Sequence, residues 1–372
     1  MTGAKERTLL RPVHLEGLDR YEPGRRIEDV QREQGLAHVI KLASNENPLG
    51  ASPLALEAAL AALAQVHRYP DGPAGTLRAA LGRRLGLPPS QVVVGNGSTD
   101  LIDLLARSFL GPEDEAVISE AAFARFRQVV NARNGRARLV PMRAWRHDLE
   151  AMRAAVGPRT RLLFVANPNN PTCTGNPRAE VDALVESLPP RVLLVLDQAY
   201  FEYADDPDYP DGTEYVRRGA PVVALRTFSK VYGLAGLRVG YAVAAPEVVE
   251  AIDTVREPFN SNAVGQAAAL AALGDGEHVR RSVELNRVEK ARLEEALRGR
   301  GLAVLPSLGN FLCVDTSGDG AEVFRRLLTR GVIVRPLRPY GMPSWLRVSV
   351  GTAEENALFL DALDQARGPR PR

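Results

Sequence analysis

The residue whose chemistry stands out first is Lys230, which follows the apolar run from Pro221 to Leu225. Such a run predicts a buried strand, and α/β proteins place functional groups just past the ends of these strands. Only four of the 47 basic residues are lysines, so lysine is the exception in this chain. A partly desolvated lysine can form a Schiff base with a carbonyl, whereas arginine stays protonated. Taken alone, Lys230 fits equally well a structural lysine that extends its amine from a strand end to solvent.

Other polar side chains follow further apolar segments, at residues 91–94, 161–165 and 191–196. These continuous segments alternate with helical ones, which indicates a mostly parallel sheet that is covered on both faces. Because parallel strands end at one edge of a sheet, we expect the residues that follow them to gather there. The residues that follow strands and could do chemistry at this edge are Gly97, Asn170, Asp197 and Lys230.

The segment from Gly95 to Asp100 is a glycine turn between a strand and an amphipathic helix. Free backbone N–H groups at a helix amino terminus can bind an anion. A dinucleotide site would need a third glycine where Asp100 stands, and a Walker motif would need a lysine that the loop lacks. We therefore predict a cradle for a single phosphate at Gly97, Ser98 and Thr99. A capped helix without a ligand is the simpler alternative.

These groups together fit pyridoxal 5′-phosphate as a cofactor. Lys230 would hold its aldehyde as an aldimine and then act as the base that moves a proton at the substrate Cα. Asp197 would keep the pyridine nitrogen protonated, so that the ring can accept electrons. Asn170 and Tyr200 would donate to the phenolic oxygen, and Phe123, in isolation better explained as a core residue, would cover the ring. The groups that would hold the phosphate are Gly97, Ser98, Thr99, Thr227, Ser229 and Arg238.

Six motifs occur in a characteristic order along the chain. They are Asn45-Glu46-Asn47-Pro48, Gly95-Asn96-Gly97-Ser98, Asn167-Pro168-Asn169-Asn170-Pro171-Thr172, Asp197-x-Ala199-Tyr200, Ser229-Lys230 with Arg238 eight residues later, and Leu346-Arg347-Val348-Ser349-Val350-Gly351-Thr352. The set resembles the fold-type I, class II aminotransferases that depend on pyridoxal phosphate, and within them it is most similar to the histidinol-phosphate aminotransferases. The resemblance extends from about Tyr21 to Thr352, which is nearly the whole chain.

The resemblance implies an α/β fold with a large domain, whose mostly parallel seven-stranded sheet lies between helices, and a smaller α+β domain. We expect residues 1–44 to form an amino-terminal arm and part of the small domain. Residues 45–255 would form the large cofactor-binding domain, and residues 256–372 the small carboxyl-terminal domain. A homodimer with shared active sites is also implied, in which Tyr69 reaches the cofactor phosphate of the neighbouring subunit.

Two positions depart from the family pattern. Cys173 stands where the family usually has glycine, so a loop that needs a positive φ could take another shape. Gln198 stands where the family usually has glutamate, which would remove a charge near the cofactor. Neither change alters Asn170, Asp197 or Tyr200, so we expect the chemistry to be retained.

Two arginines carry the prediction of the substrate. Arg347 matches the position at which aminotransferases hold a carboxylate, and Arg335, on a neighbouring strand, could add the charge that a phosphate ester needs. The resemblance also assigns Tyr21, Asn47 and Asn170 to substrate binding. We therefore expect a ping-pong exchange of L-histidinol phosphate and 2-oxoglutarate with imidazole-acetol phosphate and L-glutamate, a step of histidine biosynthesis.

Several alternative functions compete with this one. Transamination of phenylalanine or tyrosine, or decarboxylation of threonine phosphate on the same scaffold, would use the same cofactor residues. A regulator that binds the cofactor would need a DNA-binding segment, for which no residues remain. A serine hydrolase would need a Gly-x-Ser-x-Gly motif, which the chain lacks.

Bulk composition excludes other classes of protein. The 372 residues are 45% hydrophobic and carry a net charge of +2 on interspersed charges, which favours a globular enzyme over a nucleic-acid-binding protein. No apolar segment approaches the roughly 20 residues of a membrane helix, and five scattered histidines predict no metal site. Two cysteines, Cys173 and Cys313, are too few for a disulfide framework, so we expect a cytoplasmic protein.

Overall fold

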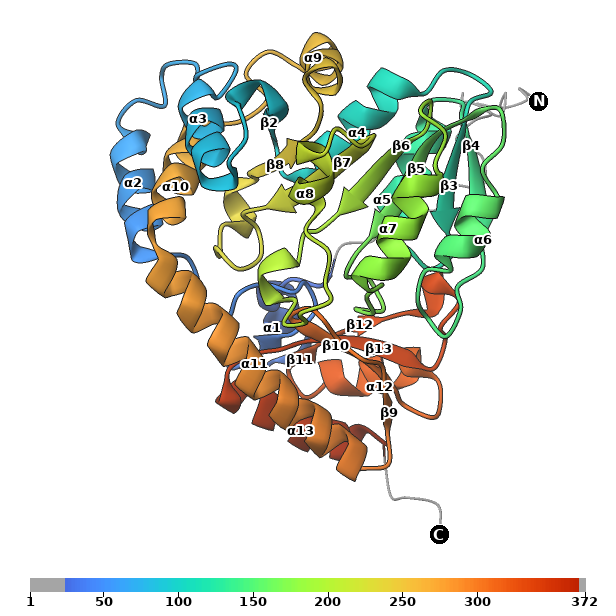
Figure 1. The fold of residues 1–372 in the computed structure, drawn as a ribbon. Coiled ribbons are helices and arrows are strands. Elements are labelled where there is room, and N and C mark those ends of the chain that lie inside the picture. The colour runs from blue at the N-terminus through green and yellow to red at the C-terminus, as the bar shows by residue number, and fades with distance from the viewer. Residues whose placement is uncertain (1–23, 368–372) are drawn as a thin grey trace, which may run out of the picture.

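The fold is described from a computed structural model, in which residues 24–367 are placed. Its centre is a seven-stranded sheet in the order β2-β8-β7-β6-β5-β3-β4 (Figure 1). All neighbouring strands are parallel except β8, which is antiparallel to both β2 and β7. The strands are β2 (Val92–Gly95), β3 (Glu115–Ser119), β4 (Arg136–Val140), β5 (Thr160–Ala166), β6 (Leu193–Asp197), β7 (Val222–Thr227) and β8 (Gly240–Val243).

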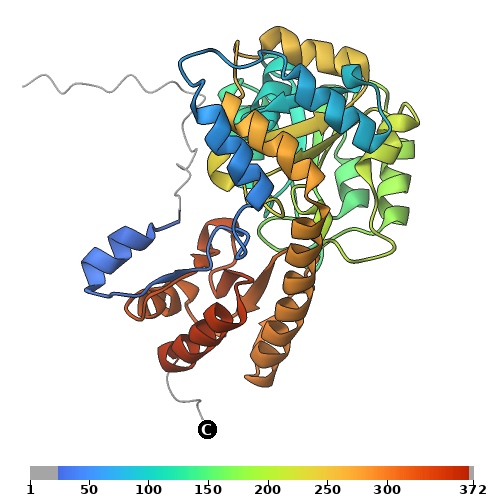
Figure 2. The ribbon, with the colours of Figure 1, turned by 90° about the vertical axis from the view of Figure 1, so that its left-hand side faces the viewer.

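Helices cover both faces of this sheet, as its continuous apolar strands predict. One face packs against α4 (Ser98–Phe109), α5 (Ala124–Ala132) and α9 (Pro246–Val255). The opposite face is covered by α3 (Gly75–Leu85), α6 (Leu149–Ala154), α7 (Arg178–Ser187), α8 (Gly212–Arg217) and α10 (Ala263–Gly274). Helix α2 (Pro53–Leu63) lies beside α10 on the outside of this layer (Figure 2).

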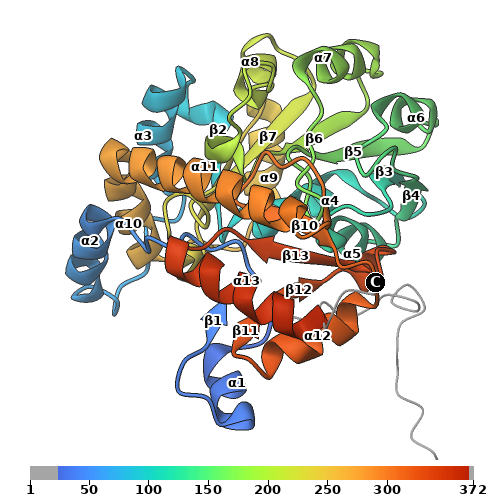
Figure 3. The same ribbon diagram turned by 90° about the horizontal axis from the view of Figure 1, so that it is seen from below.

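A second, antiparallel sheet has the strand order β12-β13-β10-β9. Its strands are β9 (Ala303–Val304), β10 (Phe311–Asp315), β12 (Arg335–Pro336) and β13 (Trp345–Ser349). Helices α12 (Gly320–Leu328) and α13 (Ala353–Arg367) pack beneath it, and the long helix α11 (Gly276–Gly299) runs from the large sheet's layer across to it (Figure 3). The amino-terminal elements α1 (Ile27–Gln34) and β1 (Ile40–Lys41) join this unit, because β1 pairs in parallel with β11 (Val332–Ile333).

The segment from Val332 to Pro336 forms two short strands that belong to different sheets. Residues Val332–Ile333 pair with β1, whereas Arg335–Pro336 pair with β13, so the segment changes sheet at Val334. Residues Val332, Ile333 and Val334 are all buried, so the apolar pattern does not show which neighbouring strand each part of the segment pairs with. Among the described residues, no helix combines the length and the apolar composition needed to cross a membrane.

Candidate active site

A cavity of about 190 Å³ lies where the large sheet meets the amino-terminal segment and the second sheet. This volume far exceeds the roughly 10–15 Å³ that one water molecule needs. The sequence-predicted residues that line it are Ser98, Thr99, Phe123, Asn170, Asp197, Tyr200, Thr227, Ser229, Lys230, Arg238, Arg335 and Arg347. The structure therefore brings together groups that lie far apart in the sequence.

One end of the cavity is suited to an anion. Helix α4 starts here after Gly97, whose φ of +81° is favourable for glycine. A Cβ on Gly97 would lie 2.4 Å from Nη2 of Arg238, so the absence of a side chain lets the guanidinium approach the helix amino terminus. Arg238 also donates to the hydroxyl of Ser229 at 3.2 Å, and the Thr227 hydroxyl lies 3.0 Å from the same oxygen. Backbone N–H groups, two hydroxyls and a guanidinium thus converge at this end.

Lys230 follows β7 and lines the middle of the cavity. Its Nζ donates to the backbone carbonyl of Ser44 at 3.0 Å. Burial lowers the pKa of the amine from 10.5 to about 7, and the positive charges of Arg347 and Arg238 act in the same direction. The amine is therefore half neutral near pH 7, the state in which it can act as a nucleophile or base.

Asp197 is the last residue of β6, Tyr200 comes three residues after it, and both line the cavity. Burial raises the pKa of the Asp197 carboxyl to about 6, although the backbone N–H of Ala199 and the charge of Lys230 favour the carboxylate. A positively charged partner within the cavity would complete its ionisation. The Tyr200 ring is 4% exposed and packs edge-on against Phe311, with ring centroids 5.1 Å apart.

The two arginines lie on neighbouring strands, directly opposite each other. The Cα atoms of Arg335 on β12 and Arg347 on β13 are register partners, so both side chains stand on the same face of the small sheet. Both also line the cavity. Arg347 is 8% exposed, and its guanidinium donates to Oδ1 of Asn170 at 2.6 Å and to the carbonyl of Ala43 at 2.5 Å. Two cations at one mouth of the cavity suit an anionic substrate group.

Three predicted site residues are not among those that line the cavity, and a fourth lies outside the described residues. Gly97 acts through its backbone and its lack of a side chain, as given above. Asn47 is buried against the carbonyl of Val231 and the hydroxyl of Ser282, each at 2.8 Å. Tyr69 is 83% exposed and stacks on Phe259. Tyr21 falls in the part of the chain that is not described.

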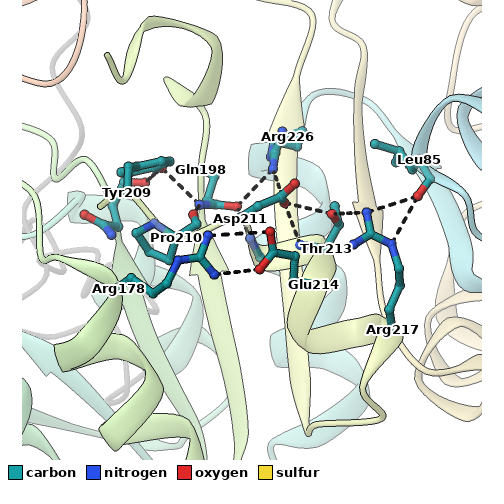
Figure 4. Close-up of polar contacts among 12 residues, drawn as sticks. Leu85, Arg178, Gln198, Tyr209, Pro210, Asp211, Thr213, Glu214, Arg217 and Arg226 are labelled. Atoms are coloured by element: carbon teal, nitrogen blue, oxygen red, sulfur yellow. Dashed lines mark hydrogen bonds and ion pairs between the residues drawn. The ribbon is translucent and has the colours of Figure 1, made fainter. Parts of the chain in front are cut away.

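Gln198 is not among the residues that line the cavity, and its side chain lies in a buried polar cluster (Figure 4). Its Nε2 donates to the hydroxyl of Tyr209 at 3.0 Å and to the carbonyl of Pro210 at 2.7 Å. Its Oε1 accepts from the N–H of Gly212 at 2.9 Å and from Arg226 at 3.2 Å. The amide uses both its donors and its acceptor, so the role of Gln198 is structural and it is not among the residues that line the cavity.

Cys173, the other departure from the family pattern, takes the backbone conformation expected of glycine. Its own φ is +61°, so the loop has the left-handed conformation for which glycine is expected. The side chain is fully buried, and the hydroxyl of Ser307 donates to its sulfur at 3.2 Å. Burial raises the pKa of the thiol, which keeps it protonated at neutral pH.

Seven of the residues that line the cavity are not predicted as site residues, and three of these seven are consecutive in the sequence. Ala43, Ser44 and Asn45 line the cavity and contact Arg347, Lys230 and Tyr200 respectively. The motif Asn45-Glu46-Asn47-Pro48 is the available signal, but the resemblance assigns Asn47 rather than Asn45 to the site. The side chain of Asn47 instead donates to the carbonyl of Val231 and the hydroxyl of Ser282. Asn45 is the asparagine of the motif that lines the cavity.

The donor set of the cavity fits pyridoxal phosphate. Its anion end could hold a phosphate dianion, Lys230 provides a neutral amine, and Asp197 provides a carboxyl group whose ionisation a ring nitrogen would complete. Phe123 lines the same space and could cover a planar ring. In the part of the chain that is described, no group of three or more His, Cys, Asp or Glu residues could hold a metal ion.

Comparisons with known proteins agree with this donor set. The sequence profile of the aminotransferase class I and II family matches residues 37–363. Histidinol-phosphate aminotransferase 2 of Pseudomonas aeruginosa is 48% identical over 94% of this chain and 95% of its own length. The histidinol-phosphate aminotransferase of an Anaeromyxobacter species is 47% identical over 96% of this chain and 99% of its own length.

The solved structures show the same relationship. The structure of histidinol-phosphate aminotransferase from Sinorhizobium meliloti in complex with pyridoxal 5′-phosphate has a TM-score of 0.88 at 30% identity. The match covers 98% of this chain and 99% of that one. The chain therefore belongs to the aminotransferase class I and II family, within which it groups with the histidinol-phosphate aminotransferases.

Proposed function

We propose that the protein is a histidinol-phosphate aminotransferase that uses glutamate and 2-oxoglutarate as the second substrate pair. The observation that carries the substrate is the pairing of Arg335 directly opposite Arg347 at the cavity. One guanidinium is sufficient for a carboxylate, whereas a phosphate ester dianion calls for more positive charge. The names of the relatives at 47% and 48% identity support the same substrate.

When bound, pyridoxal phosphate supplies a ring that withdraws electrons and so stabilises negative charge at the substrate Cα. The proton that leaves Cα would be accepted at Nζ of Lys230, whose lowered pKa makes it a base at neutral pH. Asp197 would hold the positive charge of the ring nitrogen, and the anion end at Arg238 would fix the phosphate. Arg335 and Arg347 would orient the substrate so that its Cα faces the lysine.

A transamination panel with 2-oxoglutarate as acceptor tests the substrate. We expect histidinol phosphate to have a higher kcat/KM than phenylalanine, tyrosine or threonine phosphate. Arg335→Leu should lower kcat/KM for histidinol phosphate about 10–100-fold, because a charge-assisted hydrogen bond contributes roughly 1.5–3 kcal/mol. The same variant should change phenylalanine turnover much less. Faster turnover of phenylalanine than of histidinol phosphate by the unmodified protein would overturn the proposed substrate, and release of carbon dioxide from threonine phosphate would indicate a decarboxylase.

We also propose that the enzyme is a homodimer with shared active sites. An apolar surface on and around α2 supports a second copy as the partner, because its exposed side chains are large and close together in sequence. They are Leu54, Leu56, Leu60, Leu63 and Val66, which are 48–69% exposed. Tyr69 follows this surface and is itself exposed, so it could reach the cofactor phosphate of the partner. Figure 2 shows α2 on the outside of the molecule.

The domain division is proposed at residues 45 and 255. It is supported by the separate sheets, one formed by residues 92–243 and the other by residues 303–349. The pairing of β1 with β11 supports the assignment of residues before 45 to the small domain. A cytoplasmic location is proposed because Cys173 and Cys313 are both free thiols, which persist in a reducing compartment.

A further inference from the structure

Three consecutive residues of the amino-terminal segment each bind one functional side chain of the cavity. The carbonyl of Ala43 accepts from Arg347, the carbonyl of Ser44 accepts from Lys230, and the amide of Asn45 donates to Tyr200. The first two contacts use backbone atoms, which most substitutions would preserve. The third uses a side chain, so it depends on the identity of residue 45.

The orientation of the Asn45 amide is fixed by the hydroxyl of Ser349 on β13. That hydroxyl accepts from the backbone N–H of Asn45 at 2.8 Å and therefore has its own proton free to donate. It donates to Oδ1 of Asn45 at 3.0 Å, and this assignment leaves Nδ2 facing Tyr200. Asn310 also donates to the backbone carbonyl of Asn45, at 3.1 Å. Asn45 is 1% exposed, so these partners hold it without competition from water.

The contact determines where the phenolic proton of Tyr200 can go. Nδ2 of Asn45 donates to Oη of Tyr200 at 2.9 Å, so on this side the phenol acts as an acceptor. A phenol has a single proton, which then remains available for a partner in the cavity that Tyr200 lines. A hydroxyl that accepts one hydrogen bond becomes a stronger donor in the next.

We propose that Asn45 is a positioning residue that directs the phenolic proton of Tyr200 into the cavity. It also makes the Tyr200 hydroxyl a stronger hydrogen-bond donor to the ionised phenolic oxygen of the cofactor. The proposal rests on the function proposed above. It adds a residue of the amino-terminal segment, oriented by Ser349 of the small sheet, to the groups that set the protonation state of the cofactor.

The test is the pH midpoint of the visible absorption change of the bound cofactor. A donor to the phenolic oxygen favours its ionised form and lowers this midpoint, so removal of the donor must raise it. Asn45→Gly is the suitable variant, because the φ of residue 45 is +55° and glycine adopts it without strain while the backbone contacts to Ser349 and Asn310 remain. We expect the pH midpoint of the absorption change to rise by about half a pH unit, which corresponds to a modest change in hydrogen-bond strength.

A double-mutant cycle separates this role from a merely structural one. In a Tyr200→Phe background, which has no phenolic proton, Asn45→Gly should produce no further shift. In the protein that retains Tyr200, Ser349→Ala frees the Asn45 side-chain amide to turn. This variant should therefore raise the midpoint less than Asn45→Gly does. An equal shift in both backgrounds, or no shift in either, would overturn the proposal and leave the proposed function intact. Failure of the unmodified protein to bind pyridoxal phosphate would instead overturn the function.

Discussion

Arg347 and Asn170, which both line the cavity, are joined by a hydrogen bond. Nη1 of Arg347 donates to Oδ1 of Asn170 at 2.6 Å, so the amide oxygen of Asn170 is engaged and its amide nitrogen is left for another partner. A guanidinium placed by β13 thus orients an amide that follows β5. The pairing leaves Arg347 with its full positive charge, because the amide is neutral.

Asn170→Asp should weaken substrate binding through this contact. The new carboxylate would form an ion pair with Arg347 and neutralise the charge that a substrate carboxylate needs. We expect KM for glutamate and for 2-oxoglutarate to rise about 10–100-fold, from a loss of roughly 1.5–3 kcal/mol. Steady-state kinetics with both substrates measures the change. Asn170→Ser, which removes the amide without adding charge, should change KM much less; equal effects of the two variants would contradict the explanation.

Lys230 should react with the cofactor as a group of pKa about 7. Its pKa is lowered from 10.5, so below pH 7 the reactive neutral amine falls about tenfold per pH unit, and above pH 7 it is nearly constant. The rate at which the apoprotein takes up pyridoxal phosphate in a form that borohydride fixes to Lys230 should follow this profile. A midpoint near the ordinary lysine value of 10.5 would contradict it. Arg347→Leu removes a positive neighbour and should move the midpoint upwards, whereas Lys230→Arg should fix no cofactor.

The sequence predicted most of the cavity because its residues follow strands. Asn170, Asp197 and Lys230 each come after a continuous apolar segment, and parallel strands end at the same edge. The resemblance to a known family supplied the number of strands in the large sheet and the role of Arg347. Both kinds of argument depend on motifs that are local in the sequence.

Residues placed by long-range contacts could not be predicted in this way. Asn45 and Asn47 are equivalent in a motif of two asparagines, and contacts with distant residues distinguish the one that faces the cavity: Asn45 binds Tyr200, Asn310 and Ser349. Gln198 follows Asp197 directly, yet the alternation of side chains past a strand end points it to the other side. The same holds for the segment around Val334, which pairs with β1 before this residue and with β13 after it, because those strands are distant in the sequence.

Gln198→Glu should destabilise the protein even though the family usually has glutamate here. The amide nitrogen of Gln198 donates to the carbonyl of Pro210 at 2.7 Å, and a carboxylate oxygen there would face another acceptor (Figure 4). Arg226 could compensate only in part, because Asp211 already pairs with it at 2.9 Å. We expect a loss of about 1–3 kcal/mol at about pH 8 in urea unfolding.

The pH dependence of this variant provides a further check. Once protonated, the introduced carboxyl group could donate to Pro210, so the difference from the unmodified protein should shrink as the pH falls from about 8 to about 5. The same exchange at an exposed position outside the proposed dimer surface, Gln34→Glu, should stay within about 0.5 kcal/mol at every pH. Equal stability of the Gln198→Glu variant and the unmodified protein at the higher pH would show that the cluster does not require an amide.

Leu60→Glu should dissociate the proposed dimer. Leu60 is 69% exposed on α2, so a charge there costs little in a single chain and is strongly unfavourable in an apolar interface. Sedimentation should show one chain instead of two, and the variant should release pyridoxal phosphate faster because Tyr69 of the partner subunit is lost from the site. Leu139→Glu, at a 40% exposed position on β4 far from α2, is the matched control. A dimer that survives Leu60→Glu would place the interface elsewhere.

His147 should make the stability of the protein depend on pH between about 6.5 and 4. The ring is 2% exposed; Nε2 lies 2.9 Å from the carbonyl of Ala166, and Nδ1 lies 2.6 Å from the hydroxyl of Ser119. Because a carbonyl only accepts, Nε2 carries the proton and the neutral ring satisfies both partners. Burial lowers the pKa of His147 to about 4, whereas the unfolded chain takes up a proton near 6.5.

The sign of this dependence follows from which state binds the proton. Between pH 6.5 and 4 the unfolded chain binds more protons than the folded one, so the free energy of unfolding falls as the pH falls, by about 3 kcal/mol in total from this residue. Urea unfolding of the apoprotein at about pH 7, 6 and 5 measures the slope. His147→Asn should lose stability at neutral pH but show a shallower slope below it, and His67→Asn, at an exposed position, should keep the original slope. A slope that His147→Asn leaves unchanged would assign the pH dependence to other groups.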